Sequence, residues 1–199
     1  DKIPEVMYLL SKTLLAQNKM KEAYYYLNRT IEEYPKTRYA ALSKMQIANT
    51  LKSPSDIKRA PLIYREAYQE AQDLEAAGEI AVSWAKFSLR DEDTEYANEL
   101  LHKVYSVFPA FFLIDKDATM ELLDELEEVE QYTMAAPIAA YLSGNVPYNS
   151  ELHAKLLNKS SEFYTKIGDF DMAHKLHLDF LHYHPNDKLA QKVKERDDS

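Results

Sequence analysis

Apolar side chains recur along most of the chain at steps of three and four residues, which is the spacing of one face of an α-helix. Short segments of polar residues or proline interrupt this pattern at regular intervals. The pattern predicts ten helices joined by short connections. Their approximate bounds are 4–17, 20–34, 39–52, 56–77, 79–90, 93–107, 117–131, 133–143, 149–167 and 170–184. A polar tail, 186–199, follows the last helix.

Two sets of residues indicate that these helices form an internal repeat. Prolines follow amphipathic stretches at Pro35, Pro109, Pro147 and Pro185, with separations of 74, 38 and 38 residues. An alanine stands twelve residues before each expected proline, and the alanines are 37, 37, 38 and 38 residues apart. This alanine column consists of Ala23, Ala60, Ala97, Ala135 and Ala173. A period of about 20 to 50 residues indicates a helical solenoid.

A second column, twelve residues before each alanine, is mostly small, as expected where two helices pack closely. Its members are Ser11, Ala48, Ala85, Leu123 and Ser161. Taken with the prolines, these columns make the chain resemble the tetratricopeptide repeat, a helix–turn–helix unit. Met7 to Pro35 carries the likeness in the first repeat, with Asn18-Lys-Met-Lys-Glu-Ala23 as its turn. In the last repeat, the likeness rests on the segment Gly168 to Ala173 and on His184-Pro185.

The resemblance implies an all-α fold: a right-handed α-solenoid of about five repeats within one domain, 1–185. The repeats would span about 4–37, 38–77, 78–112, 113–148 and 149–185. The period exceeds the family's of about 34 residues, so the helices should be about one turn longer. Pro61 and Pro137 fall just past the first turn of their helices, which must start late or kink. Gly78 and Gly144 suit helix C-termini.

Composition narrows the classes of function. The 199 residues include 24 Lys+Arg and 33 Asp+Glu, which gives a net charge of −9. This excess disfavours nucleic acid and anionic membrane surfaces as partners, because both attract basic proteins. The chain has no Cys, which excludes disulfides and thiolate chemistry. Its apolar runs, such as 107–114 and 134–142, are too short to span a bilayer, so no membrane insertion is expected.

The sequence lacks the usual catalytic signatures, and only 3 Gly are present to form a phosphate-binding loop. We therefore expect a protein that is not an enzyme and needs no cofactor. Histidines cluster at His174, His177, His182 and His184. The first two share a helix face with Asp171, where zinc would need further ligands from elsewhere. Because His177 lies in the packing register of the repeat, core packing is the preferred interpretation over a metal site.

The first helices of tetratricopeptide repeats line a concave surface that usually binds a peptide or a helix. By position, the resemblance implies a groove lined by Tyr8, Lys12, Leu15, Met45, Asn49, Val82, Lys86, Arg90, Asp117, Met120, Asp124, Glu127, Asn158 and Glu162. This groove would be apolar to basic in its first repeats and acidic in the fourth. The most acidic stretch of the chain, 121–130, is interpreted first as a solvated helix face. The alternative is an electronegative patch that meets a basic partner.

We therefore expect a non-catalytic scaffold that binds a protein or peptide segment in this groove or joins a larger assembly. The segment Glu33 to Tyr39 resembles linkers of tetratricopeptide proteins in bacterial envelopes, such as the assembly lipoprotein of the outer-membrane β-barrel machinery and the Tol–Pal coordinator. The alternative is thus a structural module of an envelope machine, such as a flagellar-motor scaffold, acting through its convex surface. The likeness favours the periplasm or cell envelope, with the cytoplasm as the alternative. The opening Asp-Lys-Ile-Pro suggests a trimmed piece with an exposed apolar N-terminal face.

Overall fold

The computed structural model describes residues 2–197, with side chains as far as residue 195, and folds them into thirteen α-helices without a strand. The chain forms two compact units, 1–104 (unit 1) and 105–199 (unit 2), and each is described by itself. Unit 1 contains α1 (Ile3–Ala16), α2 (Met20–Glu33), α3 (Arg38–Thr50), α4 (Pro54–Ile57), α5 (Ala60–Glu70), α6 (Leu74–Arg90) and most of α7 (Thr94–Val107). Unit 2 contains α8 (Phe111–Ile114), α9 (Lys116–Glu128), α10 (Tyr132–Ser143), α11 (Glu151–Lys166), α12 (Phe170–Tyr183) and α13 (Ala190–Asp197).

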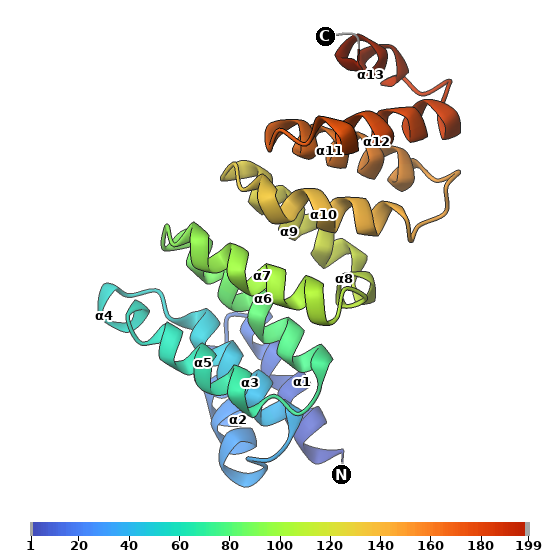
Figure 1. The fold of residues 1–199 in the computed structure, drawn as a ribbon. Coiled ribbons are helices and arrows are strands. Elements are labelled where there is room, and N and C mark those ends of the chain that lie inside the picture. Colours follow the sequence, from blue (N-terminus) through green and yellow to red (C-terminus); the bar gives the residue numbers. More distant parts are fainter. Residues whose placement is uncertain (1, 198–199) are drawn as a thin grey trace. The chain divides into compact units, whose positions relative to one another are not determined.

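Within each unit, helices that follow one another in the sequence pack side by side (Figure 1). In unit 1, α2 packs between α1 and α3, and α3 packs on α5 and α6. In unit 2, α11 packs between α10 and α12. The all-α fold of helix pairs that the sequence predicts is therefore confirmed.

The same three-residue turn joins the two helices in four of the five repeats. Its middle residue has a positive φ: 59° at Asn18, 61° at Glu92, 56° at Glu130 and 80° at Gly168. The next residue donates its N–H to a carbonyl five residues back, as in the bond from Asp169 N to Tyr164 O (2.9 Å). This is the Schellman arrangement, which satisfies carbonyls at the end of a helix. Each middle residue lies five positions before an alanine of the column, so the turns bear out the repeat register.

Both small-residue columns are buried. No alanine of the alanine column is more than 3% exposed, and no member of the second column is more than 1% exposed. Apart from Leu123, the side chains at these positions are small, which lets the two helices of a repeat approach closely. The close packing that the columns predict is therefore present in both units.

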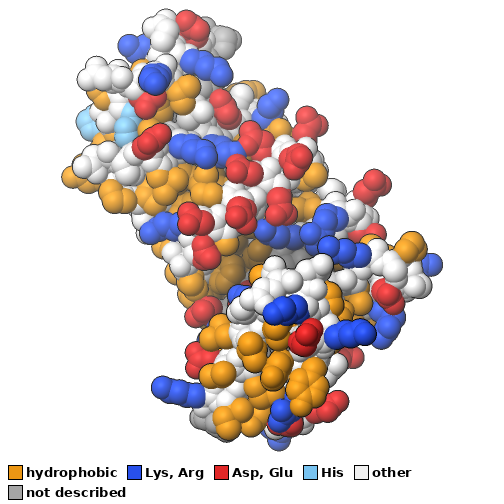
Figure 2. All heavy atoms as spheres, turned by 180° about the vertical axis from the view of Figure 1, so that it is seen from behind, with side chains coloured by type: hydrophobic (Ala, Val, Ile, Leu, Met, Phe, Trp, Pro, Cys, Tyr) orange, Lys and Arg blue, Asp and Glu red, His pale blue; other side chains and the backbone are white. Residues whose placement is uncertain are grey.

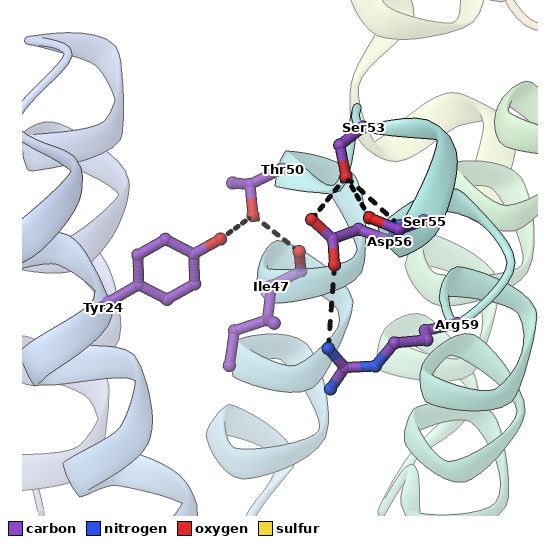
Figure 3. A network of polar contacts seen from close by, with 7 residues as sticks. All are labelled: Tyr24, Ile47, Thr50, Ser53, Ser55, Asp56 and Arg59. Atoms are coloured by element: carbon purple, nitrogen blue, oxygen red, sulfur yellow. Dashed lines mark hydrogen bonds and ion pairs between the residues drawn. The ribbon is translucent and has the colours of Figure 1, made fainter.

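The second helix of repeat two is interrupted where the sequence predicts one helix over 56–77. Ser53 caps the short helix α4 by accepting the N–H of Asp56 (3.2 Å), and its hydroxyl also donates to the Asp56 carboxylate (2.6 Å). Figure 3 shows this network together with the hydrogen bond between Tyr24 and Thr50, which joins α2 to α3. The long helix α5 begins only at Ala60, with Pro61 in its first turn. This late start is one of the two outcomes that Pro61 predicts.

In repeat four, α10 begins at Tyr132 and carries Pro137 inside it, so the late start is not seen there. Proline in this position removes one N–H that would donate to the carbonyl four residues back. The helix nevertheless continues to Ser143, where Gly144 forms its C-cap as predicted.

The prediction that Gly78 ends a helix is wrong. Gly78 is buried inside α6, which begins at Leu74 instead of residue 79. Asp73 starts the helix by accepting the N–H of Ala76 (2.8 Å), a strong N-terminal signal that outweighs one interior glycine. The boundary between the second and third helix pairs consequently lies near Gln72.

Part of the predicted polar tail forms a helix that packs on the rest of unit 2. Its residues 190–197 form α13, and residues 198–199 lie outside the described part of the chain. Ala190 and Val193 are buried in a cluster with Leu157, Leu176 and Phe180, which come from α11 and α12. These two apolar residues lie one turn apart on an otherwise polar helix and pack it on the cluster together with the partly buried Leu189.

Candidate partner-binding surface

Every residue predicted for the groove lies on the first helix of its repeat. Unit 1 holds Tyr8, Lys12 and Leu15 on α1, Met45 and Asn49 on α3, and Val82, Lys86 and Arg90 on α6. Unit 2 holds Asp117, Met120, Asp124 and Glu127 on α9, and Asn158 and Glu162 on α11. Their accessibility differs widely, and it separates side chains that can meet a partner from those that hold the fold.

Two of the predicted lining residues are packing residues. Tyr8 is 3% exposed and Met45 is 1% exposed, although they occupy the same repeat position as the half-buried Val82 and Met120. Because both side chains are buried, neither Tyr8 nor Met45 lies on a surface that a partner could reach. The ring of Tyr8 lies 5.9 Å from that of Tyr39 on the next first helix, α3, a tertiary contact that the register does not reveal.

The hydroxyl of Tyr8 lies in a polar network that joins three helices of unit 1. It donates to Glu79 Oε1 of α6 (3.5 Å) and accepts from Gln46 Nε2 of α3 (3.3 Å). Burial and the neighbouring Glu79 charge raise the pKa of Tyr8 well above its usual range. Burial also raises the pKa of Glu79, against the opposing charges of Lys12 and Arg38.

Glu79 is not among the residues predicted from the sequence, although its position in the repeat carries a signal. It occupies the same position in repeat three that Asp117 occupies in repeat four, eighteen residues before the alanine of its repeat. Applied to every repeat, that position would have selected Glu79 along with Asp117. Gln46 has no such signal, because its role depends on the position of Tyr8.

The remaining predicted residues of unit 1 are more accessible. Asn49 accepts a hydrogen bond from Tyr64 of α5, and burial, opposed by the charge of Arg90, raises the pKa of Tyr64 to about 12. Lys12 and Arg90 are exposed, and the Lys12 ammonium lies 5.7 Å from the centre of the Tyr8 ring. Lys86 and Leu15 are half-buried. The accessible side chains among these predicted residues thus include three that are basic, Lys12, Lys86 and Arg90.

In unit 2, two of the predicted carboxylates hold a lysine of the neighbouring first helix. Lys159 Nζ of α11 lies 3.0 Å from Asp124 Oδ1 and also contacts Glu127 Oε2. Only 11% of the Lys159 side chain is exposed. Burial lowers the pKa of Lys159, but hydrogen bonds to Glu127 and Asp124 outweigh this and raise it overall. The negative charge of this pair is therefore partly neutralised within the protein.

Four carboxylates of α9 remain on the surface as an acidic stripe: Asp117, Glu121, Asp124 and Glu128, all exposed. Their spacing of four, three and four residues places them on one face of the helix. The space-filling view shows acidic side chains on the surface with Lys and Arg side chains among them (Figure 2). The stripe is narrower than the stretch of carboxylates in the sequence, because Glu125 and Glu127 turn away from it and are half-buried.

The other predicted residues of unit 2 lie beside this stripe in the repeat register. Asn158 Nδ2 donates to Glu162 Oε1 within α11 (3.4 Å), and both side chains are half-buried. Met120 of α9 is half-buried as well. These residues are polar or flexible and accessible enough to take part in binding, which stays a prediction.

The histidine cluster is divided between core and surface. His177 is 4% exposed, in keeping with its packing position, whereas His174 is exposed. Among the described residues, no three His, Cys, Asp or Glu side chains stand together in a way that could hold a metal ion. Instead, the His184 Nε2 atom lies 2.8 Å from Nδ1 of His153, a buried residue of the first turn of α11. This pair was not predicted, because its members are 31 residues apart.

Acid is expected to destabilise unit 2 through His153. Burial, followed by the charge of His184, lowers the pKa of His153, against the opposing effects of the Tyr148 backbone and Asp179. As the pH falls through the ordinary pKa of about 6.5, the unfolded chain binds a proton that the folded chain does not. The free energy of unfolding should therefore fall by at most about 1.4 kcal/mol per pH unit. Urea titrations followed by circular dichroism at several pH values would measure this slope.

The variant His153→Gln is the matched comparison, because it removes this titrating group while keeping a polar side chain. Its pH slope should be smaller than that of the wild type between about pH 5 and 6.5. Equal slopes in the two proteins would contradict the assignment.

None of the described helices has the length and apolar character that crossing a membrane requires. No family model matches the chain, and no curated protein sequence does so either. Among solved structures, the chain is similar to YrrB, described as a TPR protein with an unusual peptide-binding site. The TM-score is 0.53 at 14% identity, over 95% of this chain and 90% of that chain. At this identity the likeness shows the fold, which is that of a tetratricopeptide-type helical repeat protein.

Proposed function

We propose that the protein is a non-catalytic scaffold that binds a segment of a partner protein along the first helices of its repeats. The observation that carries this proposal is the acidic stripe of α9, with four exposed carboxylates on one helix face. Support also comes from the fold, since the similar structure of YrrB is described as having a peptide-binding site. Many functions share one fold, so the proposal depends on the stripe more than on the likeness.

The stripe favours a partner segment that carries Lys or Arg. Carboxylates on a solvated helix cost little to maintain, but a complementary positive segment gains several charge contacts at once and associates faster. Lys159 lies at the edge of the site, because its ammonium group already forms ion pairs with Asp124 and Glu127. The side chains left for a partner are thus Asp117, Glu121 and Glu128.

A peptide selection with matched charge reversals tests the proposal. A random 12-residue peptide library displayed on phage would be selected against the wild-type chain, and the peptides then measured by fluorescence anisotropy. The variant Asp117→Lys/Glu121→Lys reverses two exposed carboxylates of the stripe without breaking the contacts of Lys159. The control Glu95→Lys/Glu99→Lys makes the same change at two exposed positions of α7, a second helix.

The selected peptides should be rich in Lys and Arg and should bind the stripe variant about tenfold more weakly, which corresponds to about 1.4 kcal/mol. The α7 control should bind as tightly as the wild type. Peptides that bind the stripe variant and the wild type equally well would show that the acidic stripe is only a solvated face.

A structural module in a larger assembly is the second candidate, and exposed apolar side chains on second helices favour it. Tyr25 of α2, Leu62 of α5 and Leu178 of α12 are each more than half exposed. Such residues would contact an assembly from the side opposite the first helices. We keep the bacterial cell envelope as the proposed location, on the likeness of Glu33 to Tyr39 to envelope proteins. Fractionation of the source cells would test it.

A further inference from the structure

Two histidines of unit 2 are in direct contact although they come from different helices; we call His153 and His184 the histidine pair. His153 stands in the first turn of α11, and His184 is the C-cap of α12. Nδ1 of His153 lies 2.8 Å from Nε2 of His184, and the ring centres are 5.1 Å apart. His153 is 6% exposed and His184 is half-buried. The pair therefore joins the start of one helix to the end of the next.

The contact between the two rings persists only while one of the facing nitrogens carries no proton. An imidazole nitrogen accepts a hydrogen bond in its unprotonated form alone, whereas both nitrogens of a charged imidazole are donors. When both rings are protonated, neither facing nitrogen can accept, and two positive charges stand side by side in a partly buried position. Burial and like charge both disfavour that state. The second protonation therefore separates the rings.

The charges around the pair can offset one proton more readily than two. Burial and the neighbouring His184 lower the pKa of His153, against the effects of the Tyr148 backbone and the Asp179 charge. The ring of Tyr183 packs on His153, with ring centres 5.4 Å apart. Other titratable or charged side chains on the neighbouring segments are Tyr132, Tyr141, Glu151, Lys155, His182, Asp187, Lys188, Lys192, Lys194 and Glu195. Since Asp179 carries a single negative charge, one of the two imidazolium charges would stay uncompensated by it.

His184 connects the pair to α13, which packs on α12 (Figure 1). Its carbonyl accepts the N–H of Asp187 (3.1 Å), and the Asp187 carbonyl accepts the N–H of Ala190, the first residue of α13 (3.0 Å). The His184 ring also lies 5.7 Å from the ring of Phe180, which belongs to the cluster that α13 covers. A movement of His184 is therefore transmitted both to the connection, residues 185–189, and to the surface beneath α13.

The helix α13 packs on the rest of unit 2 through few side chains. Among its described residues, Ala190 and Val193 are buried, and Leu189 just before it is half-buried. By contrast, α12 packs on α11 as well as on α13 and buries Leu176 and Phe180 among others. Because local opening begins where the fewest apolar contacts are lost, α13 separates from the unit before α12 does.

We propose that the histidine pair is an acid-sensitive switch that releases α13 from α11 and α12. At neutral pH the rings are in contact, and α13 covers Leu157, Leu176 and Phe180. When both rings are protonated they separate, the connection 185–189 moves with His184, and α13 detaches while α11 and α12 stay folded. The release exposes an apolar face of unit 2 in acid. The switch does not involve the acidic stripe of α9, and the proposed function does not require it.

Hydrogen–deuterium exchange of the intact 199-residue chain, read by mass spectrometry at about pH 7.5 and about pH 5, tests the switch. Each rate would be divided by that of the unfolded chain at the same pH, because the chemical rate of exchange itself depends on pH. The amides of residues 190–197 should lose about tenfold or more of their protection at the lower pH. Those of α12 should remain protected.

Two variants separate the pair from other acid effects. His184→Gln leaves one imidazole, so the second charge cannot form, and the protection of residues 190–197 should differ by less than about twofold between the two pH values. His153→Gln should behave in the same way and serves as a second variant. The control His174→Gln removes an exposed histidine of α12 outside the pair and should lose protection as the wild type does. Circular dichroism at both pH values would verify the helicity of each variant.

Loss of protection in the wild type and in His174→Gln, but not in the two pair variants, would support the proposal. Equal protection of residues 190–197 at both pH values in the wild type would overturn it, and so would a loss that the pair variants retain. A simultaneous loss of all protection in α12 and α13 would also overturn it, because acid would then unfold unit 2 as a whole.

Discussion

Replacing Phe180 with alanine is expected to lower the free energy of unfolding of unit 2 by about 3–5 kcal/mol. Phe180 is 0% exposed and belongs to the cluster that joins α11, α12 and α13. Its ring packs with Leu157, Leu176 and Val193, and its removal leaves a cavity that three helices cannot all close. Because α13 contributes Ala190 and Val193 alone to this cluster among its described side chains, we also expect it to detach first.

Phe170 on the same helix provides the matched control. It is 68% exposed, so Phe170→Ala should change the free energy of unfolding by no more than about 0.5 kcal/mol. Urea unfolding followed by circular dichroism would report both variants. Trp84 is the only tryptophan and lies in unit 1, so its fluorescence should show an unfolding transition that neither variant moves. Equal destabilisation by the two substitutions would contradict the assigned core.

The helices and the register could be predicted because steric demands recur at fixed spacing. The alanine column marks where two helices approach most closely, and only small side chains fit there in every repeat. The turn five residues earlier needs a positive φ, which Asn and Gly adopt more readily than Glu. Glu92 and Glu130 occupy that turn nonetheless, and the predicted helix over 117–131 wrongly ran through Glu130, because neither glutamate signals a turn by its residue type.

Elements that depend on single strong contacts could not be predicted in this way. The tail reads as polar, and only its docking shows that Ala190 and Val193 face α12. Gly78 suggests a helix end, whereas the capping by Asp73 decides where α6 begins. In each case local composition pointed one way and a specific contact decided otherwise.

The acidic charge of α9 could be read from the sequence, whereas the ion pairs that its carboxylates form could not. The repeat register placed Asp117 and Asp124 on the first helix of their repeat, and both are exposed. It could not show that Lys159, 35 residues after Asp124 in the sequence, lies between Asp124 and Glu127. Ion pairs between neighbouring repeats depend on the rotation of one helix against the next, which spacing along one chain does not specify.

The alanine column itself supplies the second large effect. Ala23→Leu should lower the free energy of unfolding of unit 1 by about 1–3 kcal/mol. Ala23 is 0% exposed where α2 packs on α1, and the additional carbon atoms of leucine would have to push the two helices apart. Leucine has nearly the helix propensity of alanine, so overpacking is the dominant cost. The fluorescence of Trp84 in urea would measure the change directly in unit 1.

Ala16→Leu is the control for this prediction, because Ala16 lies on α1 in the same unit but is exposed. It adds the same carbon atoms without displacing a neighbour and should leave the transition within about 0.5 kcal/mol of the wild type. If Ala23→Leu unfolded at the same urea concentration as Ala16→Leu, the helices would have room at this position. The alanine column would then reflect a preference other than close packing, and the repeat register would lose its physical explanation.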